Sequence, residues 1–301
     1  MSNDDRGRYK AQHSWYYILM KKLLVTGAKG FTGRHFIDNA EKAGYTVNSL
    51  ISDLTDVESL NAELSKLDPH YVVHLAGLSS VNNQDIENYY RINLFGTLNL
   101  LEALSKLHKV PSKVLLASSA NVYGGYNKNL ITEDLYPKPV NHYAMSKLAM
   151  EMMSLSYFQK LPIVVTRPFN YTGVGQSEKF LIPKIINHFK RKEKEIELGN
   201  INVLREYNDV RMVCEVYVNL LTSGIKGETY NICSGKAVSL SEIISTLEDL
   251  TNHKIKIRIN QSLIRANEIE KLSGSSEKIE NLIGPLKKYE LKETFRWMIE
   301  F

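Results

Sequence analysis

Apolar residues occur along the chain in short continuous runs, separated by segments in which they recur with helical spacing. The runs predict strands, which cover residues 21–26, 45–51, 71–77, 113–119, 162–170 and 228–233. The intervening segments predict helices over 34–43, 57–67, 85–108, 142–159, 182–189 and 239–250, the last with Ser239 as its N-cap. Continuously apolar strands that alternate with helices are typical of a parallel sheet covered on both faces, so we expect an α/β fold.

The alternation is regular up to residue 170 and looser afterwards. We therefore expect a doubly wound, Rossmann-type domain over residues 20–170. Residues 171–301 are expected to form mainly a smaller α/β substrate lobe, with some segments returning to the sheet. The run M-K-K-L-L-V-T-G from Met20 reads as a start directly into a strand, so residues 1–19 are expected to be a poorly ordered extension.

Composition narrows the class of protein. The net charge of +5 is mild, and basic residues do not form a stripe with interleaved aromatics, so no nucleic-acid partner is expected. The apolar runs are too short to span a membrane. The two cysteines, Cys214 and Cys233, predict neither a disulfide framework nor a metal site and are expected to fill core space. A reducing, cytoplasmic location fits this pattern.

The segment G-A-K-G-F-T-G follows the first predicted strand and opens the first helix. Gly27 permits the tight turn out of the strand, Gly30 lets a phosphate approach the backbone, and Gly33 lets the helix pack against the sheet. A dinucleotide pyrophosphate would then lie at the helix N-terminus, beside Lys29, Phe31 and Thr32.

The second predicted strand ends at Ile51 and Ser52 rather than at the acidic residue that usually binds the ribose hydroxyls of NAD. Lys29 could face a 2′-phosphate. These features favour NADP(H), with NAD(H) still possible because Asp53 lies about 20 residues after the glycines. Asp53 and Leu54, in D-L-T-D, are expected to contact the adenine side.

Tyr143 and Lys147 lie four residues apart on a predicted helix and therefore share one face. A phenol titrates near pH 10, and a neighbouring ammonium stabilises the phenolate. S-S-A-N-V-Y-G follows the fourth predicted strand, where a serine can bind a carbonyl oxygen and hold it for the tyrosine. This combination predicts proton transfer to or from a carbonyl group.

These segments, with H-L-A-G and R-P-F-N, make the chain resemble the extended short-chain dehydrogenase/reductases that act on nucleotide sugars, over residues 21–300. The resemblance implies that Tyr143 is the catalytic acid, that Lys147 lowers its pKa and holds the ribose, and that Ser119 rather than Ser118 orients the carbonyl. It further implies that Asn93 helps to place the lysine, and that Leu75, Ala76 and Gly77 line the cofactor site.

Family members that dehydrate a sugar carry acidic residues after the catalytic serine, where this chain has Ala120 and Asn121. The reaction class that remains is transfer of a hydride and a proton without a further catalytic base. The second half resembles the members that act on GDP-mannose derivatives, which implies NAD(P)H-dependent reduction of the 4-keto group of a GDP-4-keto-6-deoxy sugar for cell-surface polysaccharide. The segments R-E-Y-N-D-V, R-A-N-E and Gly284-Pro285 depart from the family pattern. Three alternatives therefore remain open. The protein could be a reductase or 4-epimerase of a dTDP-, CDP- or UDP-linked sugar, an enzyme of a GDP-heptose derivative, or a non-catalytic NAD(P)-binding regulator.

The same resemblance implies a set of substrate contacts. Ser80 would lie near the sugar and Asn170 near the diphosphate or sugar, while Lys184 and Arg205 would neutralise phosphates. Arg265 and Glu268 would hold the nucleoside. A homodimer built on the helices at 93–107 and 142–159 is expected.

Overall fold

The computed structural model describes residues 21–79, 85–126, 130–264 and 269–301. The expected extension at 1–19, the start at Met20, and the predicted substrate residues Ser80, Arg265 and Glu268 lie outside these ranges.

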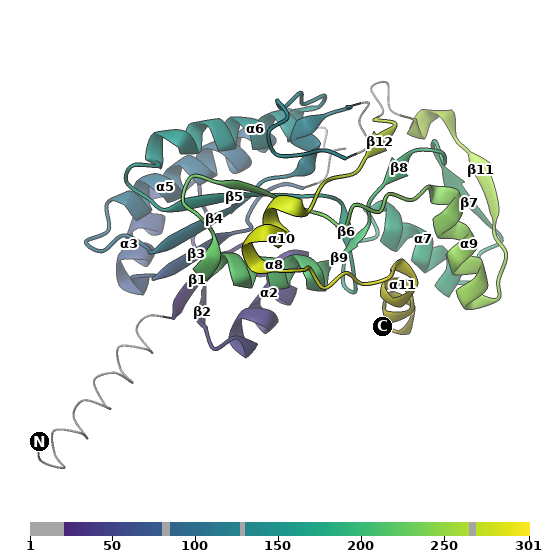
Figure 1. Cartoon of the computed structure of the whole chain (residues 1–301), viewed down its shortest axis with the longest axis horizontal. Helices are drawn as coiled ribbons and strands as arrows, with labels where there is room; N and C mark the ends of the chain where they lie inside the picture. Colours follow the sequence, from purple (N-terminus) through teal and green to yellow (C-terminus); the bar gives the residue numbers. More distant parts are fainter. Residues whose placement is uncertain (1–20, 80–84, 127–129, 265–268) are drawn as a thin grey trace, which may run out of the picture.

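A parallel sheet with strand order β10-β5-β4-β3-β1-β2 forms the centre of the molecule (Figure 1). Its strands are β1 (Lys22–Thr26), β2 (Thr46–Ser49), β3 (Tyr71–His74), β4 (Lys113–Ala117), β5 (Ile163–Pro168) and β10 (Thr229–Ile232). The chain winds from β1 to β2 on one side and from β3 to β10 on the other, so the order reverses between β1 and β3. The sheet is therefore doubly wound, and the α/β class predicted from the alternating runs is confirmed.

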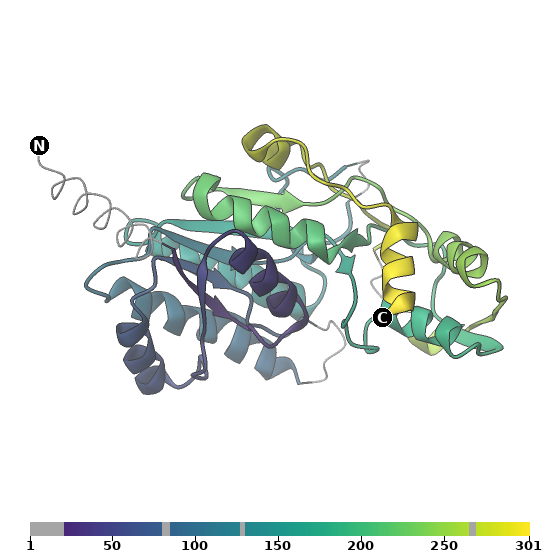
Figure 2. The same cartoon turned by 90° about the horizontal axis from the view of Figure 1, so that it is seen from below.

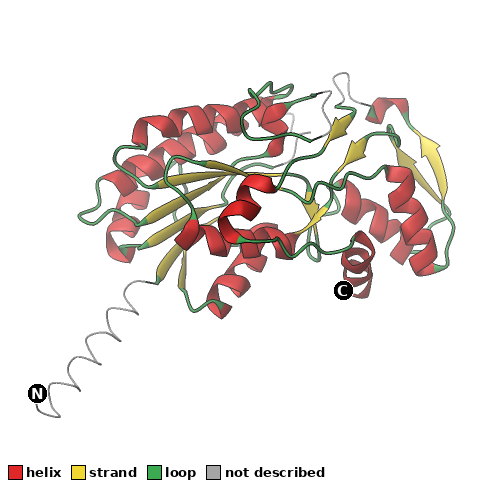
Figure 3. Cartoon of the chain, in the orientation of Figure 1, coloured by secondary structure: helices red, strands yellow, loops and turns green. Residues whose placement is uncertain are grey.

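Helices cover both faces of this sheet (Figures 2 and 3). One face carries α3 (Val57–Leu67), α5 (Thr97–Ser105) and α6 (His142–Ser154), whose apolar side chains pack on Leu24, Val72 and Leu116. The other face carries α2 (Phe31–Lys42) and α8 (Val210–Ser223), which pack on Leu23 and Val25. The core strands are apolar on both sides because both sides are buried. Cys214 and Cys233 are fully buried, as expected for core residues.

A separate hydrophobic cluster lies beyond the carboxyl ends of the strands, at the right of Figure 1. It is built by α7 (Leu181–Lys190), α9 (Leu240–Thr251), α11 (Leu291–Glu300) and the pair β7 (Glu195–Leu198) with β11 (Lys256–Ile259). Ser239 caps α9 in a capping box with Glu242, as the sequence predicts. Two short parallel pairs join the two regions: β6 (Tyr171–Thr172) with β9 (Asn208–Asp209), and β8 (Leu204–Arg205) with β12 (Lys271–Leu272).

The remaining elements are short. They are α4 (Ile86–Asn88), η1 (Tyr89–Gly96), η2 (Ala120–Tyr123), η3 (Leu155–Tyr157), η4 (Gln261–Leu263) and α10 (Glu277–Ile283). The helix predicted over 85–108 is therefore divided, because η1 is a stretch of π-helix between two α-helical segments. Among the described residues, no helix is long and apolar enough to cross a membrane.

The predicted strands extend past the observed ends at Ser49, His74, Ala117 and Pro168. Each apolar run continues past the last residue that pairs with a neighbouring strand. At that residue the chain turns away from the sheet. Since the strands are parallel, these turns collect at one edge, and the polar residues that they carry form the site described next.

Candidate active site

The glycine loop lies between β1 and α2 and is packed tightly against the end of β3. Gly27 has φ +69°, and a Cβ atom there would lie 2.6 Å from the Ala76 nitrogen. A Cβ atom on Gly33 would lie 2.3 Å from the Gly27 carbonyl oxygen. These two positions therefore require glycine for backbone packing, as the motif predicts.

The N-terminus of α2 offers backbone N–H groups to an anion. Gly30 caps the helix without a side-chain hydrogen bond, and the first turn contains no acidic residue. The Thr32 hydroxyl forms a 2.8 Å hydrogen bond with the Tyr171 hydroxyl. The rings of Phe31 and Tyr171 are stacked, with their centroids 6.1 Å apart. The loop and the helix end therefore fit a bound pyrophosphate.

Tyr143 and Lys147 occupy successive turns of α6, which begins after the Asn141 cap. Both are 7% exposed and lie close to the carboxyl end of β4, where Lys147 Nζ donates to the Ala117 carbonyl oxygen at 2.8 Å. The Ser119 hydroxyl lies near the Tyr143 phenol and acts to lower its pKa. Three residues that the sequence predicts to act together are thus adjacent.

Asn121 determines which way the Ser119 hydroxyl points. The backbone N–H and the side-chain amide of Asn121 both donate to Ser119 Oγ, at 3.2 and 3.1 Å. A hydroxyl has two acceptor lone pairs and one donor, so Ser119 is left to donate its own hydrogen to Tyr143 or to a carbonyl oxygen beside it. The Ser118 hydroxyl, by contrast, is buried without a hydrogen-bond partner among the described residues, so a bound group at this strand end could satisfy it.

Burial, rather than Lys147, sets the direction of the Tyr143 pKa shift in this structure. Burial raises the pKa of the Tyr143 phenol above its ordinary value, and the nearby Ser119 hydroxyl opposes that rise. Burial also lowers the pKa of Lys147 to about 8, although the charge of Glu151 opposes this shift. Tyr143 is consequently a neutral phenol at physiological pH, in the protonation state that an acid requires.

Asn93 lies between the end of β3 and α6. Its side-chain oxygen accepts from the Leu78 backbone nitrogen at 2.8 Å, and its amide donates to Ser146 Oγ at 3.0 Å. A Cβ atom on Gly77 would lie 2.8 Å from Asn93 Oδ1 and 3.3 Å from Lys147 Nζ. Asn93, Gly77 and Lys147 therefore meet at one point, which agrees with a role for Asn93 in placing the lysine.

His74 completes this network, although the motif that contains it gave no signal of this role. Its ring nitrogens hydrogen-bond the hydroxyls of Thr26 at 2.7 Å and Thr97 at 2.8 Å. Burial and the nearby Lys147 lower the pKa of His74 to about 3, so the ring is neutral. Thr26 also accepts from the Ala76 backbone nitrogen, and Thr97 donates to the Asn93 carbonyl oxygen. A neutral histidine thereby connects the ends of β1 and β3 to the helix that carries Asn93.

A carboxylate that the sequence pattern did not predict lies near the end of β2. Glu63, from the middle of α3, accepts from the backbone nitrogens of Ile51 at 2.9 Å and Ser52 at 2.7 Å. It also accepts from the Ser52 hydroxyl at 2.5 Å. Asp53, by comparison, accepts from its neighbour Thr55. Glu63 lies 11 residues after Ser52 and on a separate helix, so no motif at the end of the strand could have identified it.

The described substrate residues lie beyond the ends of the strands. The Asn170 carbonyl oxygen accepts from the Asn208 backbone nitrogen at 2.8 Å. Arg205 donates to the Leu204 and Ile269 carbonyl oxygens, and Lys184 on α7 donates to the Glu197 carbonyl oxygen at 3.0 Å. Arg205 thus lies in one of the short strand pairs that join the two regions, and Asn170 directly precedes the other. Lys184 lies on α7, a helix of the outer cluster.

Glu206, next to Arg205, holds these segments together. The side chain is fully buried and accepts from the backbone nitrogens of Ser234 and Gly274, both at 2.7 Å. It also accepts from the Ser273 hydroxyl at 3.0 Å. A buried carboxylate with this many donors is well satisfied, so we assign it a structural role.

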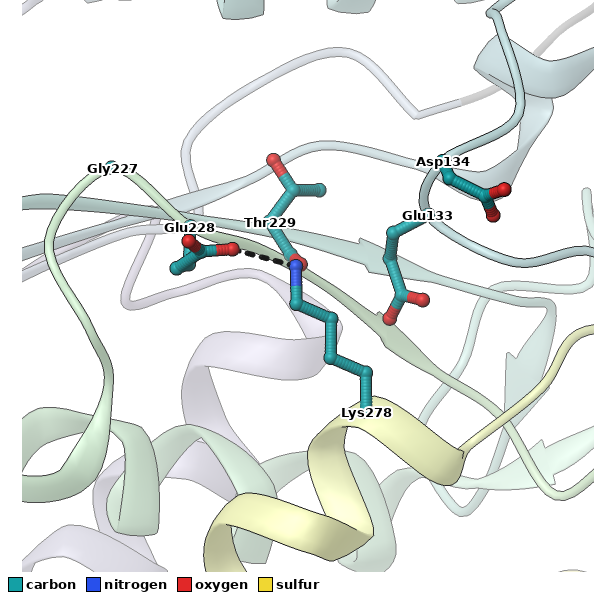
Figure 4. Close-up of a pocket in the computed structure, with 6 residues that line it drawn as sticks. All are labelled: Glu133, Asp134, Gly227, Glu228, Thr229 and Lys278. Atoms are coloured by element: carbon teal, nitrogen blue, oxygen red, sulfur yellow. Dashed lines mark hydrogen bonds and ion pairs between the residues drawn. The ribbon is translucent and has the colours of Figure 1, made fainter.

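A pocket of about 400 Å³ lies elsewhere, along the open edge of β10 (Figure 4). Lys278 donates to the Thr229 carbonyl oxygen, and Glu133 accepts from the Asn231 backbone nitrogen at 2.7 Å. These side chains satisfy the unpaired backbone groups of an edge strand, which protects the sheet from further pairing. The pocket contains none of the predicted site residues.

Comparison with known proteins agrees with this geometry. Residues 23–233 match the model of the NAD dependent epimerase/dehydratase family. The chain is 38% identical to GDP-6-deoxy-D-talose 4-dehydrogenase of Aggregatibacter actinomycetemcomitans, an alignment that covers 87% of this chain and 91% of that protein. It is 33% identical to GDP-6-deoxy-D-mannose reductase of Pseudomonas aeruginosa, over 92% of this chain and 96% of that one.

Among solved structures, RMD from Pseudomonas aeruginosa complexed with NADPH superimposes with a TM-score of 0.84 at 32% identity. The superposition covers 93% of this chain and 96% of that chain.

Proposed function

The chain belongs to the NAD dependent epimerase/dehydratase family, and we propose that it reduces the 4-keto group of a GDP-4-keto-6-deoxy sugar. It is an NAD(P)-dependent oxidoreductase acting on a nucleotide sugar. The observation that carries the specific reaction is the placement of Ser119 near Tyr143 and beside the neutral Asn121. This set can transfer one proton to a carbonyl oxygen but offers no carboxylate after the serine to abstract a proton from carbon.

Ser119, Tyr143 and Lys147 have separate roles in the proposed reduction. Ser119 donates a hydrogen bond to the keto oxygen, since both of its lone pairs are occupied by Asn121. Tyr143 gives its proton to that oxygen as the C–O bond becomes single. The Lys147 ammonium then stabilises the phenolate that remains. The nicotinamide, when bound, supplies the hydride.

The binding residues of the cofactor follow from the same placement. Gly27, Gly30 and Gly33 shape the pyrophosphate cradle, while Leu75, Ala76 and Gly77 line the inner wall. Residues 20–170 then act mainly as the dinucleotide domain, and residues 171–301 mainly as the nucleotide-sugar lobe. In that lobe, Asn170 and Arg205 lie nearest to the junction of the two regions and bind the diphosphate.

The proposed reaction has a direct test. Purified protein is mixed with NADPH or NADH and freshly made GDP-4-keto-6-deoxymannose. We expect it to oxidise the reduced nicotinamide, so that the absorbance of the nicotinamide band falls. The dTDP-, CDP- and UDP-linked 4-keto sugars serve as controls for the base, and analysis of the product distinguishes the manno from the talo configuration at C4. Absence of oxidation with every base would contradict a reductase.

Two other functions predict different results. A 4-epimerase would interconvert reduced UDP- or GDP-sugars without net consumption of the nicotinamide. A non-catalytic NAD(P)-binding regulator would show a higher melting temperature with dinucleotide, with no further increase on adding any sugar nucleotide. The placement of the buried Tyr143 near Ser119 favours an enzyme over the regulator.

The exposed face of α6 and its neighbours favours a homodimer. Four apolar side chains on this face are about half exposed: Phe95 at 53%, Met145 at 49%, Met152 at 51% and Leu155 at 52%. Since η1 packs beside α6, they can form one surface for a second copy.

Met152→Glu is therefore expected to weaken the dimer about a hundredfold, because burying an unpaired carboxylate costs several kcal/mol. Light scattering after size exclusion measures the change. Ile225→Glu, at a 55% exposed position away from this face, is the matched control and should leave the dimer intact. A monomeric wild type would contradict the interface.

A further inference from the structure

The carboxylate of Glu63 is held by three donors that converge from one short segment. Ile51 and Ser52 lie two and three residues after the end of β2. Their two backbone N–H groups and the Ser52 hydroxyl all point at Glu63, at 2.9, 2.7 and 2.5 Å. These donors keep the pKa of Glu63 below its usual value despite partial burial, so the group is charged at physiological pH. A negative charge is therefore fixed at the carboxyl end of β2.

This position has a known consequence in a doubly wound dinucleotide site. The adenosine ribose lies over the end of the second strand, where an acidic residue accepts from the 2′-hydroxyl and a cation accommodates a 2′-phosphate. Neither Ile51 nor Ser52 is charged, which by itself favoured NADP(H). Glu63 instead favours NAD(H), because it brings a carboxylate to the same place from α3.

The three hydrogen-bond donors around Glu63 bear on the choice of dinucleotide as much as the charge of Glu63 does. Two backbone N–H groups and a hydroxyl form the kind of nest that binds a phosphate, and here an internal carboxylate already occupies it. A 2′-phosphate would have to displace Glu63 or lie beside it. Lys29 is the cation of the glycine loop that would act in the opposite direction. Arg34 is engaged by the Lys29 and Gly175 carbonyl oxygens.

We propose that Glu63 determines the choice of dinucleotide, and that it makes this protein favour NAD(H) over NADP(H). The inference rests on the dinucleotide site of the proposed function but not on the identity of the sugar. Glu63 supplies from α3 the acidic group that β2 lacks.

Binding of the cofactor alone tests the proposal, by calorimetry with NADH and NADPH and with the adenosine halves 5′-AMP and adenosine 2′,5′-bisphosphate. The wild type is expected to bind the compound without the 2′-phosphate about tenfold tighter in each pair, since like charges about 4 Å apart repel by roughly 1–4 kcal/mol. Glu63→Gln is expected to remove most of that ratio. Glu58→Gln, which removes an exposed charge from the first turn of the same helix, should leave the ratio unchanged.

Equal ratios in Glu63→Gln and the wild type, or a wild type that prefers NADPH, would overturn the proposal. Should Glu63→Gln fail to fold, Ser52→Arg carries the test: a cation at this position is expected to invert the preference, and an unchanged ratio would contradict it. Failure to bind any dinucleotide would overturn this inference and the reductase together. Preferential NADH binding without reduction of any sugar nucleotide would leave this inference standing and remove only the reductase.

Discussion

Tyr143→Phe is expected to reduce turnover about a thousandfold while binding the dinucleotide almost as tightly as the wild type. A positioned general acid contributes about 10²- to 10⁴-fold to a rate, and Tyr143 is the phenol that lies near Ser119 at the strand end. Burial keeps the pKa of this phenol high, so it holds a proton to give. Because only the hydroxyl is removed, the ring still fills its place beside Tyr89, 6.2 Å away between centroids.

Single-turnover reduction of the keto sugar, together with calorimetric titration of the dinucleotide, measures the two quantities separately. Tyr71→Phe is the matched control, since Tyr71 begins β3 and therefore lies at the opposite edge of the sheet from the site. Turnover in Tyr143→Phe within a few-fold of the wild type would mean that another group donates the proton. Loss of dinucleotide binding would mean that the phenol is structural.

Much of the fold and the centre of the site could be predicted because their signals are local. The apolar runs placed every strand of the main sheet, and the glycine triple and the Tyr143–Lys147 spacing are contained within single turns or loops. The ends of the elements were less accurate, since an apolar run does not reveal where the ladder stops. The π-helical stretch at Tyr89–Gly96 has the same apolar spacing as an ordinary helix, so it could not be distinguished.

The missed residues share a different property: each is connected to the site only through tertiary contacts. Glu63 reaches Ser52 from a helix that the sequence correctly predicted, but a helical pattern does not indicate which side chain bends back to a strand end. His74 was quoted within a motif, yet its role depends on two threonines from other elements. The burial that raises the pKa of Tyr143 was also not foreseen, because burial is a property of the whole fold rather than of a residue spacing.

Glu151 continues the stripe on α6 that begins with Tyr143 and Lys147, one helical turn further on. It forms a buried ion pair with Arg167 on β5, in which the closest atoms lie 2.6 Å apart, and the side chains are 4% and 6% exposed. The Arg167 guanidinium also lies 4.8 Å from the centre of the Tyr123 ring. The charge of Glu151 raises the pKa of Lys147 and so opposes the effect of burial on the lysine. The pair thus connects the stability of the fold to the protonation of the site.

Glu151→Ala is accordingly expected to cost about 3–5 kcal/mol in the free energy of unfolding, because it leaves the Arg167 guanidinium buried without its partner. Urea denaturation measures the loss, and Glu290→Ala, from an ion pair that is 74% exposed at the glutamate, should cost less than about 1 kcal/mol. The double change Glu151→Met with Arg167→Met should recover most of the stability, since a buried pair is often replaceable by apolar side chains of similar volume. In that variant the pKa of Lys147 loses the contribution that raises it and falls below about 8, so reductase activity should decline at a lower pH than in the wild type. A stable double variant whose alkaline limit does not move would confine Glu151 and Arg167 to packing and separate them from the chemistry of the lysine.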